Sequence, residues 1–135
     1  MQKIIEETNA INWFQIPVLE TQRAKKFYET ILDIQMQTQQ IRETNEELTF
    51  FPFKAGVIRA TSGRVSGVLA KNERSRPSKD GITVYLNANP SIQTVIDKIE
   101  PAGGKIIMPK TKIKAGYFSV FIDTEGNKMG LHAEA

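Results

Sequence analysis

The chain contains no cysteine and no long apolar run, and it has only one histidine and one tryptophan among 135 residues. The absence of cysteine excludes disulfides and thiolate chemistry. No apolar run approaches the ~20 residues that a membrane-spanning helix needs. Residues 1–10 also lack the hydrophobic core of a signal peptide. We therefore expect a cytoplasmic protein that has no membrane partner.

Positive charge is unevenly distributed along the chain. The formal net charge is +3, and residues 1–70 hold eight Lys or Arg and eight Asp or Glu. Residues 71–135 hold ten and seven, so the whole excess lies in the second half. One interpretation is a patch that binds anions or nucleic acid. We favour a solvated linker and an edge strand, because Lys110, Lys112 and Lys114 alternate by two and lysine discourages edge pairing. No nucleic-acid partner is expected.

The first half of the chain has the pattern of a strand, an amphipathic helix and further strands. In residues 12–18, Phe14, Ile16 and Val18 share one face, which is typical of a strand with two different faces. Residues 21–32 are predicted to form a helix, with Thr21 as a plausible N-cap. Its apolar stripe has helical spacing and consists of Ala24, Phe27, Tyr28, Ile31 and Leu32. Further strands are predicted at residues 34–42, 48–53, 57–60 and 65–71.

The pattern restarts after residues 72–81, which have the composition of a linker. A strand is predicted at residues 82–87, and a helix with Asn89 as N-cap and Pro90 at its first position. The stripe of this helix consists of Ile92, Val95, Ile96 and Ile99. Strands are predicted at residues 105–108, 117–122 and 128–133, with a hairpin turn at 124–127.

These elements predict a single α+β domain over residues 1–135, built from two βαβββ modules. The modules cover residues 11–71 and 82–134, and residues 72–81 link them. Neither module could bury much core alone. Together they can form curved mixed sheets around a concave pocket, with both helices outside.

The parity of the strands predicts which side chains line the concave face. The aliphatic residues of the two first strands should face the helices, so the opposite set should face the pocket. The predicted pocket residues are Trp13, Gln15, Phe51, Phe53, Thr83, Tyr85, Asn87, Tyr117, Ser119, Phe121 and His132. Aromatic walls with a few amides and hydroxyls are typical of small-ligand sites. The alternative is that these aromatic side chains fill the cavity as a second core.

Four segments of the chain resemble a known family in their order and spacing. They are residues 11–28, Gly103-Gly104-Lys105, residues 116–121, and Asp123-Thr124-Glu125-Gly126-Asn127 followed by Gly130-Leu131. In this order they resemble the vicinal oxygen chelate superfamily, which includes glyoxalase I, extradiol dioxygenases, and the bleomycin and fosfomycin resistance proteins. The subgroup that the chain resembles most is the glyoxalase/bleomycin resistance protein group. The resemblance covers residues 11–133.

The resemblance implies a metal site whose usual ligands are missing here. The family holds its metal with His, Gln or Glu at four positions, which fall on Trp13, Gly67, Thr83 and Gly130. An indole nitrogen cannot coordinate a metal, glycine offers no side chain, and threonine is a weak ligand. We therefore expect no metal and no other cofactor.

His132 is the first candidate for a catalytic side chain, and a metal-free enzyme would rely on His132 or Tyr85. The ordinary pKa of histidine would suit a general acid or base, and His132 could also be one ligand of a displaced metal. The interpretation that we favour is a histidine hydrogen-bonded within the cavity wall or partly exposed near the chain end.

Three functions follow from these features. The favoured hypothesis is a metal-free protein that binds a small organic molecule in an aromatic cavity. The second is a lyase, isomerase or dioxygenase of the superfamily that uses metal-free or displaced-site chemistry. The third is a non-catalytic subunit or sensor with a vestigial pocket. Whether the protein is an enzyme stays open at this point, and the resemblance implies a homodimer in which modules of two chains share a cavity.

Overall fold

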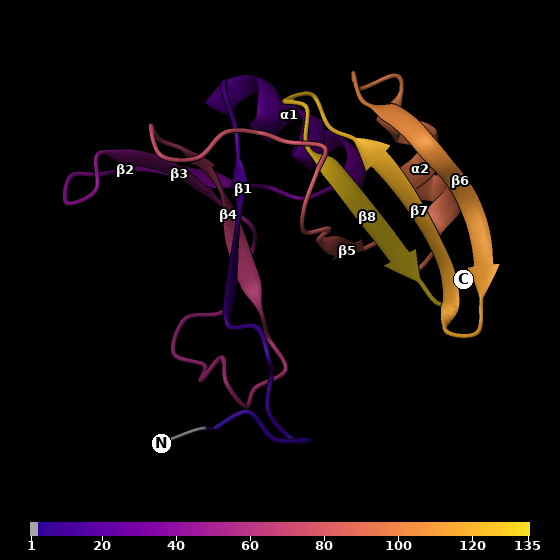
Figure 1. The fold of residues 1–135 in the computed structure, drawn as a ribbon, viewed down its shortest axis with the longest axis horizontal. Helices are drawn as coiled ribbons and strands as arrows, with labels where there is room; N and C mark the ends of the chain where they lie inside the picture. The colour runs from indigo at the N-terminus through magenta and orange to yellow at the C-terminus, as the bar shows by residue number, and fades with distance from the viewer. Residues whose placement is uncertain (1–2) are drawn as a thin grey trace.

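Two four-stranded sheets and two helices make up the fold in the computed structural model, which describes residues 3–135 (Figure 1). The first half contains β1 (Trp13–Pro17), α1 (Thr21–Leu32), β2 (Gln37–Ile41), β3 (Glu46–Phe50) and β4 (Ser66–Lys71). The second half contains β5 (Tyr85–Asn87), α2 (Ile92–Ile99), β6 (Lys105–Ile113), β7 (Gly116–Ile122) and β8 (Lys128–Ala133).

The two sheets have the same strand order, which confirms the predicted repeat of βαβββ modules. Their orders are β1-β4-β3-β2 and β5-β8-β7-β6. In each sheet the first strand of the module is parallel to the last, and the other neighbours are antiparallel. The sheets are therefore mixed, and the predicted α+β fold is confirmed.

Most predicted elements are found, with some different boundaries. The first helix and the last strand have the predicted bounds. The strand predicted at residues 57–60 is wrong, because the chain forms turns there between Gly56 and Gly63, whose φ values are +80° and +71°. The N-caps are also wrong: Glu20 precedes α1 and Ser91 precedes α2. The edge strand that the lysine spacing predicts is confirmed as β6, which runs on to Ile113.

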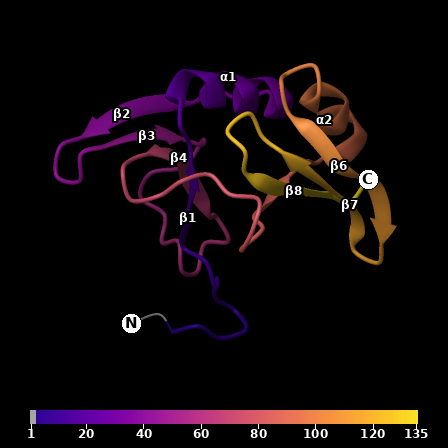
Figure 2. The same cartoon turned by 45° about the horizontal axis from the view of Figure 1, so that its top comes forward.

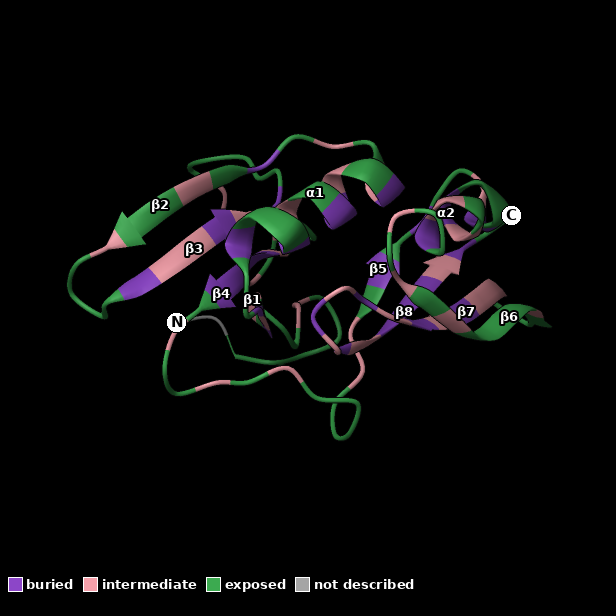
Figure 3. Ribbon diagram, turned by 90° about the horizontal axis from the view of Figure 1, so that it is seen from above, coloured by how far each residue is buried: buried purple, intermediate pink, exposed green. Residues whose placement is uncertain are grey.

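Both helices bury their predicted apolar stripes and pack side by side on the same side of the molecule (Figure 2). The core lies between these helices and the sheets, where the buried residues gather (Figure 3). Phe27 of α1 packs against Phe121 of β7 with ring centroids 6.0 Å apart, so the core includes residues of both halves. Each large apolar side chain buried there stabilises the fold by about 1.5 to 3 kcal/mol.

The backbones of the two sheets lie apart. Among the elements of residues 3–135, no strand of one sheet contacts a strand of the other. The halves meet through α1 and α2 and through the turn between β7 and β8. Each sheet therefore has one face that points away from the helices and is not covered by the other sheet. No helix in the described part of the chain has the length and apolarity to cross a membrane.

Candidate functional site

The face of the second sheet that points away from the helices carries an aromatic and polar row. The register pairs Tyr85 with Gly130 and Asn87 with His132, and it places Phe118 directly opposite His132. Paired residues point to the same face of a sheet. Three side chains of the predicted pocket, Tyr85, Asn87 and His132, are therefore brought together.

A cavity of about 590 Å³ lies over this row. Its lining residues, which we call the tyrosine pocket, are Tyr85, Leu86, Asn87, Asn89, Ile113, Phe118 and His132. The rings of Tyr85 and Phe118 meet edge to face at 6.4 Å between centroids. The walls are mostly apolar and carry a few polar groups, which is the usual chemistry of a site for a small organic molecule.

Hydrogen bonds hold the polar groups of the tyrosine pocket in fixed orientations. The Nε2 atom of His132 lies 2.8 Å from the carbonyl oxygen of Ala115. A carbonyl only accepts, so Nε2 is the donor of this hydrogen bond. The Asn87 Oδ1 atom accepts from the backbone N–H and the Nδ2 group of Asn89, both at 2.9 Å. Asn87 Nδ2 thus has no protein acceptor among residues 3–135 and can donate to a ligand.

The corresponding face of the first sheet carries Trp13, Gln15 and Phe50. Trp13 is paired with Ser66, and Gln15 is paired with Val68, which also pairs with Phe50. The rings of Trp13 and Phe50 are 6.1 Å apart, and Phe50 continues to Phe53 at 5.8 Å. These contacts make an aromatic row along the edge of the first sheet.

A second cavity of about 390 Å³ lies at the end of this row. Its lining residues, which we call the arginine pocket, are Pro52, Phe53, Lys54, Val57, Arg59, Gly63, Arg64, Val65 and Ser66. The guanidinium of Arg59 lies over the Trp13 ring, 5.0 Å from its centroid. This is a cation–π contact, and it joins the pocket to the aromatic row.

This architecture places the chain in a family. A model of the Glyoxalase/Bleomycin resistance protein/Dioxygenase superfamily matches residues 10–131. The chain belongs to this superfamily. No protein among curated sequences matches it.

Solved structures of superfamily proteins share the fold at low sequence identity. A glyoxalase I mutant from Zea mays is 16% identical with a TM-score of 0.67, and the match covers 91% of this chain and 45% of that one. The antibiotic binding protein TnmS3 from Streptomyces sp. CB03234 is 18% identical with a TM-score of 0.66, covering 94% and 97%. The fosfomycin resistance protein FosX from Listeria monocytogenes, complexed with Mn(II) and dihydroxypropylphosphonic acid, is 13% identical with a TM-score of 0.64, covering 98% and 95%. This chain thus spans less than half of the plant glyoxalase, and these likenesses show the fold alone.

The residues at the superfamily's metal positions do not fit a metal ion. A Cβ on Gly67 would lie 2.2 Å from the Phe14 carbonyl oxygen, beside the Phe14 ring, so this position faces the helices. The prediction that Gly67 occupies the ligand position on the concave face is therefore wrong, and its neighbour Ser66 lies there instead. Gly130 does face the concave side, where the Tyr85 ring covers it. An indole, hydroxyl groups and a glycine are no donor set for a divalent metal.

No alternative metal site replaces this one within residues 3–135, where no three His, Asp or Glu side chains cluster in a way that could hold an ion.

Four of the predicted pocket residues lie on the other side of their sheets. Phe51 is buried in the core, where its ring lies 5.6 Å from Phe14 and 5.8 Å from Tyr28. Tyr117, Ser119 and Phe121 also face the helices, because β7 pairs Phe118, not Ser119, with His132. The concave face carries Phe50 at the end of β3, and Phe118 and Val120 in β7.

Of the remaining predicted residues, Phe53 and Trp13 lie at the arginine pocket, and Gln15 and Thr83 line neither pocket. Phe53 lines the arginine pocket and is half exposed, and Trp13 lies against Arg59. Gln15 is exposed on the concave face, and Thr83 is half-buried just before β5. Sequence reasoning missed other lining residues of the two pockets and of the aromatic row, chiefly Phe50, Arg59, Asn89, Ile113 and Phe118.

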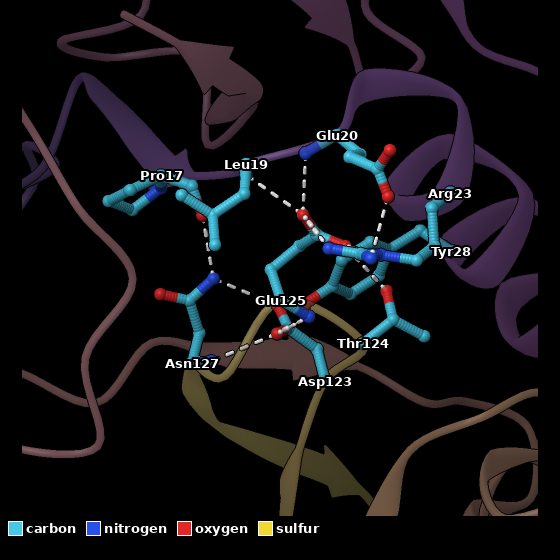
Figure 4. A network of polar contacts seen from close by, with 9 residues as sticks. All are labelled: Pro17, Leu19, Glu20, Arg23, Tyr28, Asp123, Thr124, Glu125 and Asn127. Atoms are coloured by element: carbon cyan, nitrogen blue, oxygen red, sulfur yellow. Dashed lines mark hydrogen bonds and ion pairs between the residues drawn. The ribbon is translucent and has the colours of Figure 1, made fainter. Parts of the chain in front are cut away.

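A polar network joins the start of α1 to the turn between β7 and β8 (Figure 4). The Glu125 carboxylate accepts hydrogen bonds from the backbone N–H groups of Leu19 and Glu20, each at 2.8 Å, and from Arg23 Nε at 2.6 Å. It therefore caps the start of α1 from the other module. Burial raises the pKa of Glu125, but the hydrogen bonds from Arg23 and the backbone outweigh it, and the net pKa is lowered.

Asp123 is the second centre of this network. Tyr28 donates its hydroxyl to Asp123 Oδ2 at 2.7 Å, and the backbone N–H groups of Glu125 and Asn127 donate to Oδ1. Burial, followed by the negative charge of Asp123, raises the pKa of Tyr28 well above its ordinary value. Asn127 Nδ2 reaches back to the carbonyl oxygen of Pro17 at 2.7 Å. This network fixes how α1 and β1 lie relative to the second sheet.

Proposed function

We propose that this protein binds a small organic molecule in the tyrosine pocket and does so without the metal of its superfamily. The observation that carries the proposal is the 590 Å³ cavity with an edge-to-face pair of aromatic rings and a free amide donor on Asn87. The ligand expected for this pocket is largely aromatic and has a hydrogen-bond acceptor for Asn87. The antibiotic binding by TnmS3 agrees with such a role in this fold.

We also propose that a second copy of the chain completes the cavity. Within residues 3–135 of one chain, neither sheet covers the concave face of the other. At the free edge of the second sheet, Ile82 is 90% exposed and Tyr85 is 51% exposed. Exposed apolar side chains beside the free edge of a strand are suited to an interface. A homodimer that brings the first sheet of one chain against the second sheet of its partner would cover them.

A neutral fluorescent probe tests the pocket. N-phenyl-1-naphthylamine becomes more fluorescent in an apolar site, and we expect it to bind the wild-type protein. Tyr85→Ala removes one of the two paired rings and should weaken the affinity about tenfold, since an aromatic contact of this kind is worth about 1 to 1.5 kcal/mol.

The matched control is Ile107→Ala, which truncates another half-exposed apolar side chain that lines neither pocket. Its affinity should equal that of the wild type. Equal binding by wild type and Tyr85→Ala would contradict the proposed site.

A further inference from the structure

The loop between β3 and β4 carries positive charge that no acidic residue balances. Between Glu47 and Glu73 the sequence has no Asp, Glu or His. Three cationic side chains of this stretch, Lys54, Arg59 and Arg64, line the same arginine pocket. The ion pairs of residues 3–135 join Arg23 to two glutamates and Arg74 to Glu46, so none of them neutralises this pocket.

Arg59 is held in place from both ends. Its carbonyl oxygen accepts a hydrogen bond from Asn9 Nδ2, and Asn9 N–H donates to Ala60 at 2.8 Å. Its guanidinium lies over the Trp13 ring. A cation–π contact uses no N–H donor, and no residue among 3–135 accepts a hydrogen bond from this side chain, so its N–H groups are free for a pair of oxygen atoms. Arg59 is thus a pre-oriented fork for a carboxylate or a sulfonate.

An aromatic surface continues from this fork. The rings of Trp13, Phe50 and Phe53 follow one another at 6.1 and 5.8 Å on the face where Ser66 also lies. A ligand whose anionic group met Arg59 would extend its rings over this row. A cationic ligand would find no carboxylate in the lining of the pocket.

We propose that the arginine pocket is the anion subsite for the protein's ligand, which is an aromatic molecule bearing a carboxylate or sulfonate group. This rests on the proposed function and on its homodimer, in which the first sheet of one chain faces the second sheet of its partner. Arg59 binds the anionic group, Lys54 and Arg64 add positive potential, and the row of Trp13, Phe50 and Phe53 stacks against the rings.

A matched pair of probes separates the charge from the ring system. 8-Anilinonaphthalene-1-sulfonate has the same rings as N-phenyl-1-naphthylamine and one added sulfonate. Trp13 is the only tryptophan, so quenching of its fluorescence reports binding beside Arg59. We expect the sulfonate probe to quench Trp13 and to bind at least tenfold more tightly than the neutral probe. Its affinity should fall with salt, because the interaction of partly exposed charges is screened.

Variants of Arg59 locate the anion. Arg59→Gln should weaken the sulfonate probe about tenfold or more and leave the neutral probe unchanged within threefold. Arg59→Lys should give an intermediate loss, because it keeps the charge but not the planar fork. The control Arg42→Gln, an exposed arginine that lines neither pocket, should change neither affinity. An unchanged melting temperature of Arg59→Gln would show that the loss is local.

Two outcomes would overturn the inference in distinguishable ways. If the neutral probe binds as tightly as the sulfonate, or if Arg59→Gln binds both like wild type, the anion subsite is wrong while the aromatic pocket stands. If neither probe binds, the proposed function itself fails.

Discussion

At the scale of single residues, Gly67 of β4 and Gly130 of β8 make room for aromatic rings. Gly67 lies between Phe14 and Phe51, whose rings approach to 5.6 Å on the helix side of the first sheet. Gly130 lies beneath the ring of Tyr85 on the opposite, concave face of the second sheet. The two glycines thus face opposite sides of their sheets, and only Gly130 lies at a pocket.

This difference predicts unequal effects of adding a methyl group. In Gly67→Ala the new Cβ would lie 2.2 Å from a backbone oxygen of the neighbouring strand, which cannot move without disturbing β1. We expect a loss of about 3 kcal/mol in the free energy of unfolding, the upper part of the usual cost of overpacking. In Gly130→Ala the nearest atoms belong to the half-exposed Tyr85 ring, which can rotate away, so we expect about 1 kcal/mol or less. Denaturant unfolding measures both, and equal losses would contradict this account.

At the scale of elements, the start of α1 depends on a carboxylate from the other half of the chain. No side chain at the N-cap position makes the capping hydrogen bond. Glu125 supplies the acceptor instead and pairs with Arg23. Since its folded pKa is lowered, the ionised carboxylate stabilises the fold above its unfolded pKa, and this stability is lost as the pH falls through the folded value.

Glu125→Gln should therefore lower the free energy of unfolding by about 2 kcal/mol at neutral pH, the usual worth of hydrogen bonds to a buried charged group. The gap between variant and wild type should narrow as the pH falls below the ordinary range of a glutamate. Glu20→Gln is the matched control, because its carboxylate also pairs with Arg23 but is 65% exposed. It should cost less than about 0.5 kcal/mol. A pH-independent gap for Glu125→Gln would contradict the capping role.

Some elements of the fold can be predicted from the sequence, and others cannot. The stripes of α1 and α2 have unbroken helical spacing, and β8 follows a clear turn, so these elements and the repeat are predictable. The faces of β3 and β7 are not predictable, because aromatic residues occupy consecutive positions there: Phe50 and Phe51 at the end of β3, and Tyr117 and Phe118 in β7. The hydrophobic pattern then does not show which of the two residues faces the core.

The length of the turn between β7 and β8 determines which residues of β7 lie on the concave face. A four-residue turn at 124–127 would place Ser119 opposite His132. Asp123 N–H instead bonds to the Asn127 carbonyl at 2.9 Å, so the loop includes Asp123 and the register shifts by one residue. That shift moves Phe118 onto the concave face. The arginine pocket was missed because it depends on a loop with no periodic pattern.

At the scale of the whole molecule, the two halves share one core, and the concave face of each sheet stays open. The helices and the network around Glu125 and Asp123 fix the two halves to each other. The tyrosine pocket lies on one sheet and the arginine pocket at the end of the other. In the proposed dimer, each cavity would be formed by the tyrosine pocket of one chain and the arginine pocket of its partner.

Native mass spectrometry of protein purified without chelator shows the metal content, the bound ligand and the oligomeric state in one spectrum. We expect a dimer without a stoichiometric divalent metal that takes up one aromatic ligand per chain. The same spectrum of Tyr85→Ala should show less bound ligand at equal ligand concentration. A full equivalent of bound nickel, zinc, iron or manganese per chain, retained in the wild-type protein, would contradict the claim that this pocket works without the metal of its superfamily.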